Sequence, residues 1–235
     1  MVKAVIFDMD GTLVDSVDLH AKAWQDAFRD FGQDFELEAI RQQIGKGGDQ
    51  LLPVFLTREE IDAKGQALEK HRGKILKERY LSQIKAFPKV PELFQRIRAD
   101  QVKIVLASSA KGDELQTYKK IAGIQGLVDA ETSSDDAEKS KPHPDIFQAA
   151  MAKLEGIHKT EVVVVGDSPY DAEAAGKAGL STIGFLSGGF AEAGLRDAGC
   201  FAIYDGPADL LARYDESVLA AAKSVVDGRR ASEVR

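Results

Sequence analysis

Carboxylates, hydroxyls and lysines gather at four places in this sequence. The first is 8–16, which reads Asp-Met-Asp-Gly-Thr-Leu-Val-Asp-Ser and follows an apolar run. Two further groups also follow apolar runs: 107–111 holds two serines and a lysine, and 166–171 holds aspartates at positions 167 and 171. The fourth group, 139–145, contains Lys-Ser-Lys-Pro and precedes a predicted helix.

These residue types predict a cation-assisted reaction of a phosphate group. Carboxylates that are massed together repel one another and are costly unless a cation joins them. Oxygen ligands without a nearby histidine or cysteine suit Mg²⁺ rather than Zn²⁺. A lysine and a hydroxyl beside that cation would complete a cradle for phosphate. The side chains alone therefore indicate Mg²⁺-assisted phosphoryl transfer.

Apolar, β-branched runs predict the strands that would carry these groups. The runs are 2–7, 102–107, 161–166, 181–185 and 201–204, with a short one at 127–130. Helical stretches alternate with them at 91–99, 112–122, 144–154 and 170–178. This alternation predicts an α/β fold with a Rossmann-like parallel sheet and helices on both faces. Because ligands of such sheets bind beyond the carboxyl ends of the strands, we expect the polar groups to share one edge.

The stretch between the first two predicted strands has a different pattern. No strand signal occurs over 17–84, whereas apolar residues recur there at helical spacing, most clearly over 58–81. We therefore predict an inserted α-helical cap domain at 16–84. The catalytic core would then consist of 1–15 and 85–235.

The four polar groups together resemble the motifs of the haloacid dehalogenase superfamily. The matching residues are Asp8-x-Asp10-Gly11-Thr12 for the first motif, Ser108 for the second, Lys141 in Ser140-Lys141-Pro142 for the third, and Gly166-Asp167-Ser168-x-x-Asp171 for the fourth. They occur in the family's order, and the helical insertion after the first motif resembles the family's C1 cap. The combination is similar to the branch of phosphoglycolate phosphatases and β-phosphoglucomutases, which implies a HAD-like fold.

The resemblance implies a two-step mechanism. Asp8 would be the nucleophile that forms an aspartyl-phosphate, and Asp10 would protonate the leaving oxygen and then deprotonate the attacking water. Lys141 would neutralise charge that grows on the phosphoryl oxygens. The implied phosphate contacts are Gly11, Thr12, Ser108, Ser109 and Lys141, and the implied Mg²⁺ ligands are Asp8, Asp10 through its carbonyl, and Asp167, with Asp171 as a further ligand or a carboxylate behind the ligands.

Three residues of the predicted cap are candidates for contacting the substrate. His20 lies four residues before Trp24 on one helix face and would sit near the opening between cap and core. Lys46 and Asp49 belong to a glycine-rich stretch, 44–50, that resembles the specificity loop of C1 caps. An ordinary turn between two cap helices is the alternative interpretation of that stretch.

The predicted function is a Mg²⁺-dependent phosphatase that hydrolyses a small phosphorylated metabolite. A β-phosphoglucomutase-like phosphomutase is the main alternative, but it needs a second cationic phosphate site, for which the cap loop offers only Lys46. A 2-haloacid dehalogenase would lack the carboxylate that Asp10 provides. A phosphonate hydrolase would use a cap lysine for a Schiff base, and a non-catalytic binding module would have lost a motif residue.

Composition limits the remaining classes of protein. The 235 residues are 44% hydrophobic and 29% charged, which excludes a disordered chain and a small disulfide scaffold. The formal net charge of −7 disfavours a nucleic-acid partner. No apolar run is long enough to span a bilayer, and the single Cys200 cannot form a disulfide within the chain. We expect a cytoplasmic monomer or weak homodimer whose partner is a small phosphorylated metabolite.

Overall fold

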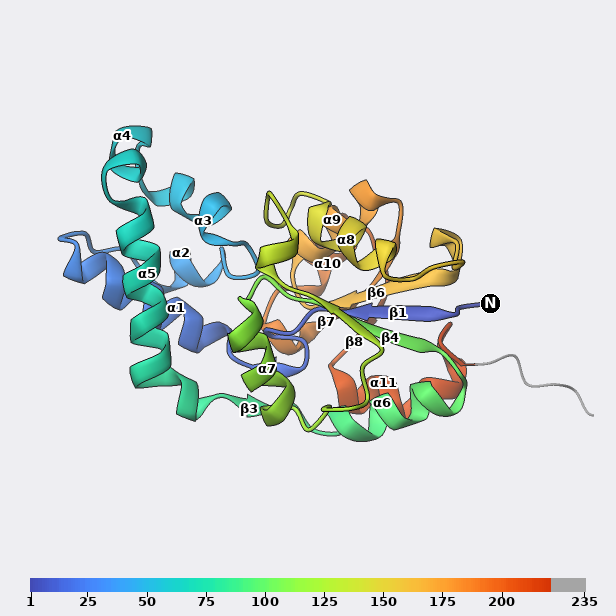
Figure 1. Cartoon of the computed structure of the whole chain (residues 1–235). Coiled ribbons are helices and arrows are strands. Elements are labelled where there is room, and N and C mark those ends of the chain that lie inside the picture. The colour runs from blue at the N-terminus through green and yellow to red at the C-terminus, as the bar shows by residue number, and fades with distance from the viewer. Residues whose placement is uncertain (221–235) are drawn as a thin grey trace, which may run out of the picture.

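A six-stranded parallel sheet forms the centre of the molecule in a computed structural model of the chain, which describes residues 1–220 (Figure 1). The strands are β1 (Ala4–Phe7), β4 (Lys103–Ala107), β5 (Ala130–Thr132), β6 (Val162–Gly166), β7 (Ser181–Phe185) and β8 (Cys200–Tyr204), in the spatial order β5-β4-β1-β6-β7-β8. The predicted parallel sheet is thus confirmed. The last part of the predicted core, 221–235, lies outside the described residues.

Helices cover both faces of this sheet, and alternation along β1 explains why. Val5 and Phe7 belong to one apolar cluster, and Ala4 and Ile6 belong to another on the opposite face. A strand that is buried on both faces needs apolar residues at successive positions, which is the pattern of β1. The helices of the first face are α6 (Val90–Ala99), α7 (Gly112–Ile121) and α11 (Pro207–Ala212), those of the second are α8 (Asp145–Ala152) and α9 (Pro169–Ala178), and α10 (Glu192–Asp197) packs near β8.

The register of the central strands brings three chain segments to the same height. Phe7 of β1 is paired with Leu106 of β4 and with Val165 of β6. The residues that follow each of these positions therefore emerge side by side at the carboxyl edge. From β1 the chain goes first to β4 on one side of β1 and later to β6 on its other side, so the strand order reverses at β1. The carboxyl edge at such a reversal is a common place for a ligand.

The stretch from 17 to 83 is helical, as predicted. Its elements are α1 (Val17–Asp30), α2 (Leu37–Arg41), α3 (Gly48–Phe55), α4 (Arg58–Glu60), a π-helical stretch (Ile61–Gly65), α5 (Gln66–Ile75), a second π-helical stretch (Leu76–Tyr80) and a 3₁₀ turn (Leu81–Gln83). They share an apolar cluster of their own, built around Trp24 and Phe28. In Figure 1 these helices stand to one side of the sheet.

A short antiparallel ladder, which sequence reasoning missed, lies at the base of this helical segment. β2 (Val14–Asp15) pairs with β3 (Lys85–Ala86), Asp15 opposite Lys85. Two-residue strands carry too little pattern to be detected in a sequence. The predicted run at 127–130 also begins later than expected, at Ala130. Just before it, the Asp129 side chain accepts the Ile104 N–H at 2.8 Å.

No helix within residues 1–220 is both long and apolar enough to cross a membrane.

Candidate active site

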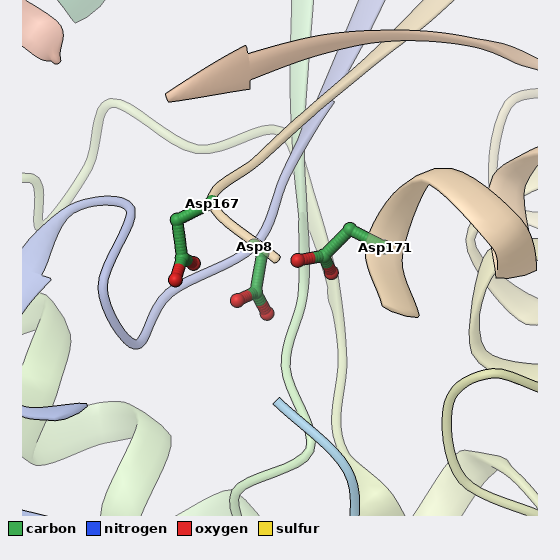
Figure 2. A group of neighbouring side chains, drawn as sticks. All are labelled: Asp8, Asp167 and Asp171. Carbon is green, nitrogen blue, oxygen red and sulfur yellow. The ribbon is translucent and has the colours of Figure 1, made fainter. Parts of the chain in front are cut away.

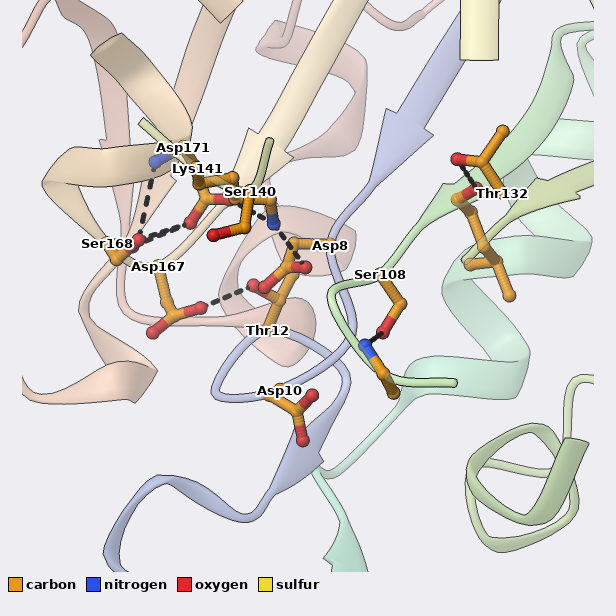
Figure 3. A network of polar contacts seen from close by, with 12 residues as sticks. Asp8, Asp10, Thr12, Ser108, Thr132, Ser140, Lys141, Asp167, Ser168 and Asp171 are labelled. Atoms are coloured by element: carbon orange, nitrogen blue, oxygen red, sulfur yellow. Dashed lines mark hydrogen bonds and ion pairs between the residues drawn. The ribbon is translucent and has the colours of Figure 1, made fainter. Parts of the chain in front are cut away.

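The carboxyl edge of the sheet gathers the polar groups that the sequence singled out (Figure 3). Asp8 follows β1, Ser108 follows β4 and Asp167 follows β6. Lys141 reaches the same edge from the connection between β5 and α8, and Asp171 reaches it from the first turn of α9. Apart from Asp167 and Asp171, these residues are far apart in the sequence, so the fold of the sheet and its connections brings them together.

Lys141 is the cation at the centre of the group. Its Nζ lies 2.6 Å from Asp8 Oδ1 and 2.7 Å from Asp171 Oδ1, and the side chain is 1% exposed. Burial by itself lowers the pKa of a lysine, but the charges of Asp171 and Asp8 outweigh burial and raise the pKa of Lys141. Lys141 therefore stays charged and is available to neutralise an anion.

Three buried carboxylates surround a common point beside this lysine. One oxygen of Asp8, one of Asp167 and one of Asp171 lie within 4.8 Å of one another, and Figure 2 shows the three side chains directed toward the same space. Burial, with the charges of Asp171 and Asp10, raises the pKa of Asp8 to about 7, although Lys141 opposes the change. Burial and the charges of Asp171 and Asp8 also raise the pKa of Asp167 well above its ordinary value.

The donor set fits a hard divalent cation. Three carboxylates face one lysine, which leaves excess negative charge in a buried place. Asp8 Oδ1 contacts Lys141 and Asp167 Oδ1 accepts from Thr12 Oγ1 at 2.8 Å, whereas no described residue donates a hydrogen bond to Oδ2 of Asp8 or Asp167. Two such oxygens in an oxygen-only site suit Mg²⁺, which is usually held by one or two carboxylates.

Asp171 is engaged by the protein on both of its oxygens. Ser168 caps α9, and Asp171 Oδ2 accepts from the Ser168 N–H at 3.1 Å and from Ser168 Oγ at 2.6 Å. Asp171 Oδ1 is paired with Lys141. This arrangement suits a carboxylate that orients the lysine more than one that gives an oxygen to a metal.

Two glycines form the wall against Asp167. A Cβ on Gly11, whose φ is +73°, would lie 2.3 Å from Asp167 Oδ2, and a Cβ on Gly188 would lie 1.8 Å from it. Any side chain at these positions would displace the carboxylate. Sequence reasoning found Gly11 through its motif but missed Gly188, whose only signal is a Gly-Gly pair soon after a predicted strand.

Asp10 points to a different set of partners. Its Oδ1 accepts from Ser16 Oγ at 2.6 Å and contacts His20 Nε2 at 2.9 Å. Burial raises the pKa of Asp10, but the charge and hydrogen bond of His20, together with the bond from Ser16, outweigh burial and hold the pKa below its ordinary value. The carboxylate of Asp10 is therefore not part of the cluster formed by Asp8, Asp167 and Asp171.

The predicted phosphate contacts differ in how far the protein itself already engages them. The Ser108 hydroxyl is fully buried and accepts from the Ala110 N–H at 3.1 Å, at the turn between β4 and α7. Ser109 is partly exposed in the same turn. The Thr12 hydroxyl is used to orient Asp167, so only the backbone of Thr12 remains for a phosphate.

The glycine-rich stretch of the helical segment touches the edge without reaching the carboxylates. Asp49 accepts from the Ser140 N–H at 3.1 Å and from Ser140 Oγ, and Ser140 Oγ accepts from the Gly47 N–H at 2.9 Å. Lys46 Nζ contacts Gln43 Oε1 at 2.6 Å and lies 4.5 Å from the centre of the Tyr170 ring. Asp49 thus contacts the neighbour of Lys141, and Lys46 lies against α9.

Comparison with known proteins gives consistent matches. A family model described as haloacid dehalogenase-like hydrolase matches residues 5–185. A phosphoglycolate phosphatase of Cereibacter sphaeroides is 30% identical over 221 residues, which is 89% of this chain and 97% of that protein. The chloroplastic protein SUPPRESSOR OF QUENCHING 1 of Arabidopsis thaliana is 33% identical over 208 residues, 87% of this chain but only 20% of that longer protein.

A solved structure gives the same result in three dimensions. The crystal structure of a hydrolase from Pseudomonas syringae superimposes with a TM-score of 0.83 at 32% sequence identity. The match covers 91% of this chain and 98% of the other chain.

Proposed function

The chain belongs to the haloacid dehalogenase-like hydrolases, and from this premise we propose that it is a Mg²⁺-dependent phosphatase acting on a small phosphorylated metabolite through an aspartyl-phosphate. One observation carries the proposal: the buried Asp8 contacts the charged Lys141 and also lies close to Asp167, whose Oδ2 accepts no hydrogen bond from a described residue. The relatives named as phosphatases support the same reaction class.

In the first step, Asp8 acts as the nucleophile. A carboxylate oxygen of Asp8 bonds to phosphorus while the phosphorus–oxygen bond to the leaving group breaks. Lys141 lies 2.6 Å from Asp8 and neutralises charge on the phosphoryl oxygens as they approach. Asp10 gives its proton to the departing oxygen; the negative phosphate beside Asp10 raises the pKa of this carboxyl on binding and so favours its protonation.

In the second step, Asp10 is a base. It is then ionised, as its lowered pKa favours, and removes a proton from the water that attacks phosphorus. The bond between phosphorus and the Asp8 oxygen breaks, and inorganic phosphate leaves with the Asp8 carboxylate regenerated. The proton returns to Asp10, so the cycle is balanced.

Asp8, Asp167 and the Asp10 carbonyl would hold Mg²⁺. Asp171 would lie next to these ligands without binding the ion directly. The ion would neutralise the carboxylates and the phosphate so that the two anions can meet. The Ser108 hydroxyl and the backbone at Gly11, Thr12 and Ser109 would contact the remaining phosphate oxygens.

We further propose that 16–84 acts as a cap over a core formed by 1–15 and 85–235, hinged at the β2–β3 ladder. His20, Lys46 and Asp49 would line the cap side of the site, and closure would exclude water. A cytoplasmic location and a monomeric or weakly dimeric state remain predictions.

The test is phosphate release from a panel of phosphorylated metabolites, with Mg²⁺ and with EDTA. We expect release that requires Mg²⁺, that is lost in Asp8→Asn and that is unchanged in Asp62→Asn, an exposed aspartate of the helical segment whose side chain is 74% exposed. Turnover in Asp8→Asn would refute the assignment of Asp8 as the nucleophile. No release from any substrate, with bisphosphate-primed isomerisation of β-glucose 1-phosphate instead, would make the protein a phosphomutase.

A further inference from the structure

Asp10 is connected through His20 to two residues that no motif identified. His20 Nε2 lies 2.9 Å from Asp10 Oδ1 and 3.0 Å from the Tyr118 hydroxyl. That hydroxyl donates to Glu114 Oε1 at 2.7 Å. Tyr118 is fully buried, and both it and Glu114 lie on α7 of the sheet body, whereas His20 belongs to α1 of the helical segment.

The direction of these hydrogen bonds follows from counting hydrogens. A tyrosine hydroxyl has one hydrogen, and Tyr118 gives it to Glu114. The Tyr118 oxygen can therefore only accept from His20, so Nε2 of His20 must carry a hydrogen. That hydrogen lies between the Tyr118 oxygen and Asp10 Oδ1, and the result is the same whether the imidazole is neutral or charged.

The alternative direction is unfavourable for Asp10. Without Glu114, the Tyr118 hydroxyl could turn its hydrogen toward Nε2, and His20 would present a lone pair to the Asp10 carboxylate. Burial first, and then the charges of Asp10 and Glu114, raise the pKa of Tyr118, so the phenol does not ionise and its single hydrogen remains. Glu114 thus selects the form of His20 that donates to Asp10.

We propose that Tyr118 and Glu114 are positioning residues that fix His20 as a donor to Asp10 Oδ1 and so reserve Asp10 Oδ2 for proton transfer to the leaving group. Oδ1 already receives the Ser16 hydroxyl and the His20 N–H, which leaves Oδ2 as the oxygen to exchange a proton. The inference rests on the proposed phosphatase function. It also links the orientation of Asp10 to the seating of α1 against α7.

The test compares two substrates that differ in their need for an acid. An alkyl phosphate has a poor leaving group that must be protonated, whereas 4-nitrophenyl phosphate has a good leaving group that departs without a proton. General acids contribute typically about 10²–10⁴-fold, so mispositioning one should cost a part of that range. Tyr118→Phe removes the oxygen that accepts from His20 and so frees the imidazole ring to move away from Asp10. In this variant we expect kcat/KM for the alkyl phosphate to fall by about 10- to 100-fold and that for 4-nitrophenyl phosphate by less than about 3-fold.

Two further variants separate positioning from packing. Glu114→Ala should reproduce the selective loss, because the Tyr118 hydrogen becomes free to turn, and Glu114→Gln should restore activity, because its amide oxygen can accept the same bond. Tyr80→Phe is the matched control: the Tyr80 hydroxyl also donates to an aspartate, Asp26 at 2.8 Å, but in the helical segment away from Asp10. We expect no change in that variant.

A double-mutant cycle completes the experiment. In an Asp10→Asn background, Tyr118→Phe should cause no further loss, because the residue acts through Asp10. Equal losses for both substrates, or an additive loss in the cycle, would overturn the inference and leave the phosphatase intact. Absence of Mg²⁺-dependent phosphate release from the unmodified protein would instead overturn the proposed function.

Discussion

The buried carboxylates should make the stability of this protein depend on Mg²⁺ in a pH-dependent way. Asp8 has a pKa of about 7 in the folded chain against an ordinary value of 3.8, because burial disfavours its charged form. Between these two pH values the folded state binds more protons than the unfolded state, so the free energy of unfolding of the metal-free protein falls as pH rises from about 4 to about 7. The raised pKa of Asp167 acts in the same direction.

The magnitude can be worked from the same shift. About 3 pKa units at about 1.4 kcal/mol each set an upper limit on the order of 4 kcal/mol for Asp8. Mg²⁺ needs the ionised carboxylate, so its apparent affinity should fall up to about tenfold for each pH unit below 7. At about 100 times its dissociation constant at pH 8, Mg²⁺ would stabilise by about 2.7 kcal/mol, and by almost nothing at pH 5.

Thermal melting followed by circular dichroism, in EDTA and in Mg²⁺ across pH 5 to 8, measures this directly. A chain of this size shifts its Tm by about 2–4 °C per kcal/mol, so the gain from Mg²⁺ should be about 5–10 °C at pH 8. Asp8→Asn should lose most of that gain and be more stable than the unmodified protein in EDTA at pH 8. Asp62→Asn, with its exposed side chain, is the control.

Two results would refute this reasoning. One is a Mg²⁺ gain of equal size at pH 5 and pH 8. The other is an Asp8→Asn variant that is no more stable than the unmodified protein in EDTA at pH 8, which would mean that the Asp8 charge carries no burial cost.

Three further substitutions test the site. Lys141→Met should lower kcat by at least about 100-fold in phosphate-release assays. The same change should destabilise the metal-free protein by about 3–5 kcal/mol in urea titration, because three buried carboxylates lose their cation. Gly188→Ala should abolish the Mg²⁺-induced rise in Tm while circular dichroism shows an intact fold, because its Cβ would lie 1.8 Å from Asp167 Oδ2; Gly194→Ala, with nothing within 4 Å, should leave that rise unchanged. Asp49→Asn should weaken the contact with Ser140 by about 1–2 kcal/mol, and KM should therefore rise by about 5- to 30-fold while kcat falls less. An unchanged KM would show that this contact does not hold the helical segment closed.

The sheet and its acidic edge could be predicted because their signals are local. A parallel strand buried on both faces must be a continuous apolar run, and β1 is one, with Asp8 directly after it. Strand ends then come together through the regular register of the sheet, so Asp8 and Asp167 meet although many residues separate them. In this part of the molecule, local pattern is enough to place the candidate residues.

Other parts of the site depend on contacts that leave no local signal. Tyr118 lies on an amphipathic helix, and its spacing indicates only core packing. Its hydroxyl nevertheless contacts His20, which is distant in the sequence. Gly188 is defined by its distance from Asp167, and the partner of Asp49 is Ser140, far along the chain. Such pairs are set by how loops and helices pack, which spacing along the chain does not encode.

The β2–β3 ladder has a consequence for how the chain is assembled. Because Asp15 and Lys85 face one another as an antiparallel pair, the backbone leaves the sheet body and returns to it at the same point. In topological terms, the entire helical segment is a very long β-hairpin loop. The entropy of closing a loop grows only with the logarithm of its length, so an insertion of this size costs the sheet body little more than a short one would. A tight turn that joins Asp15 to Lys85 should therefore leave a sheet body that can still fold, with its acidic edge open to solvent.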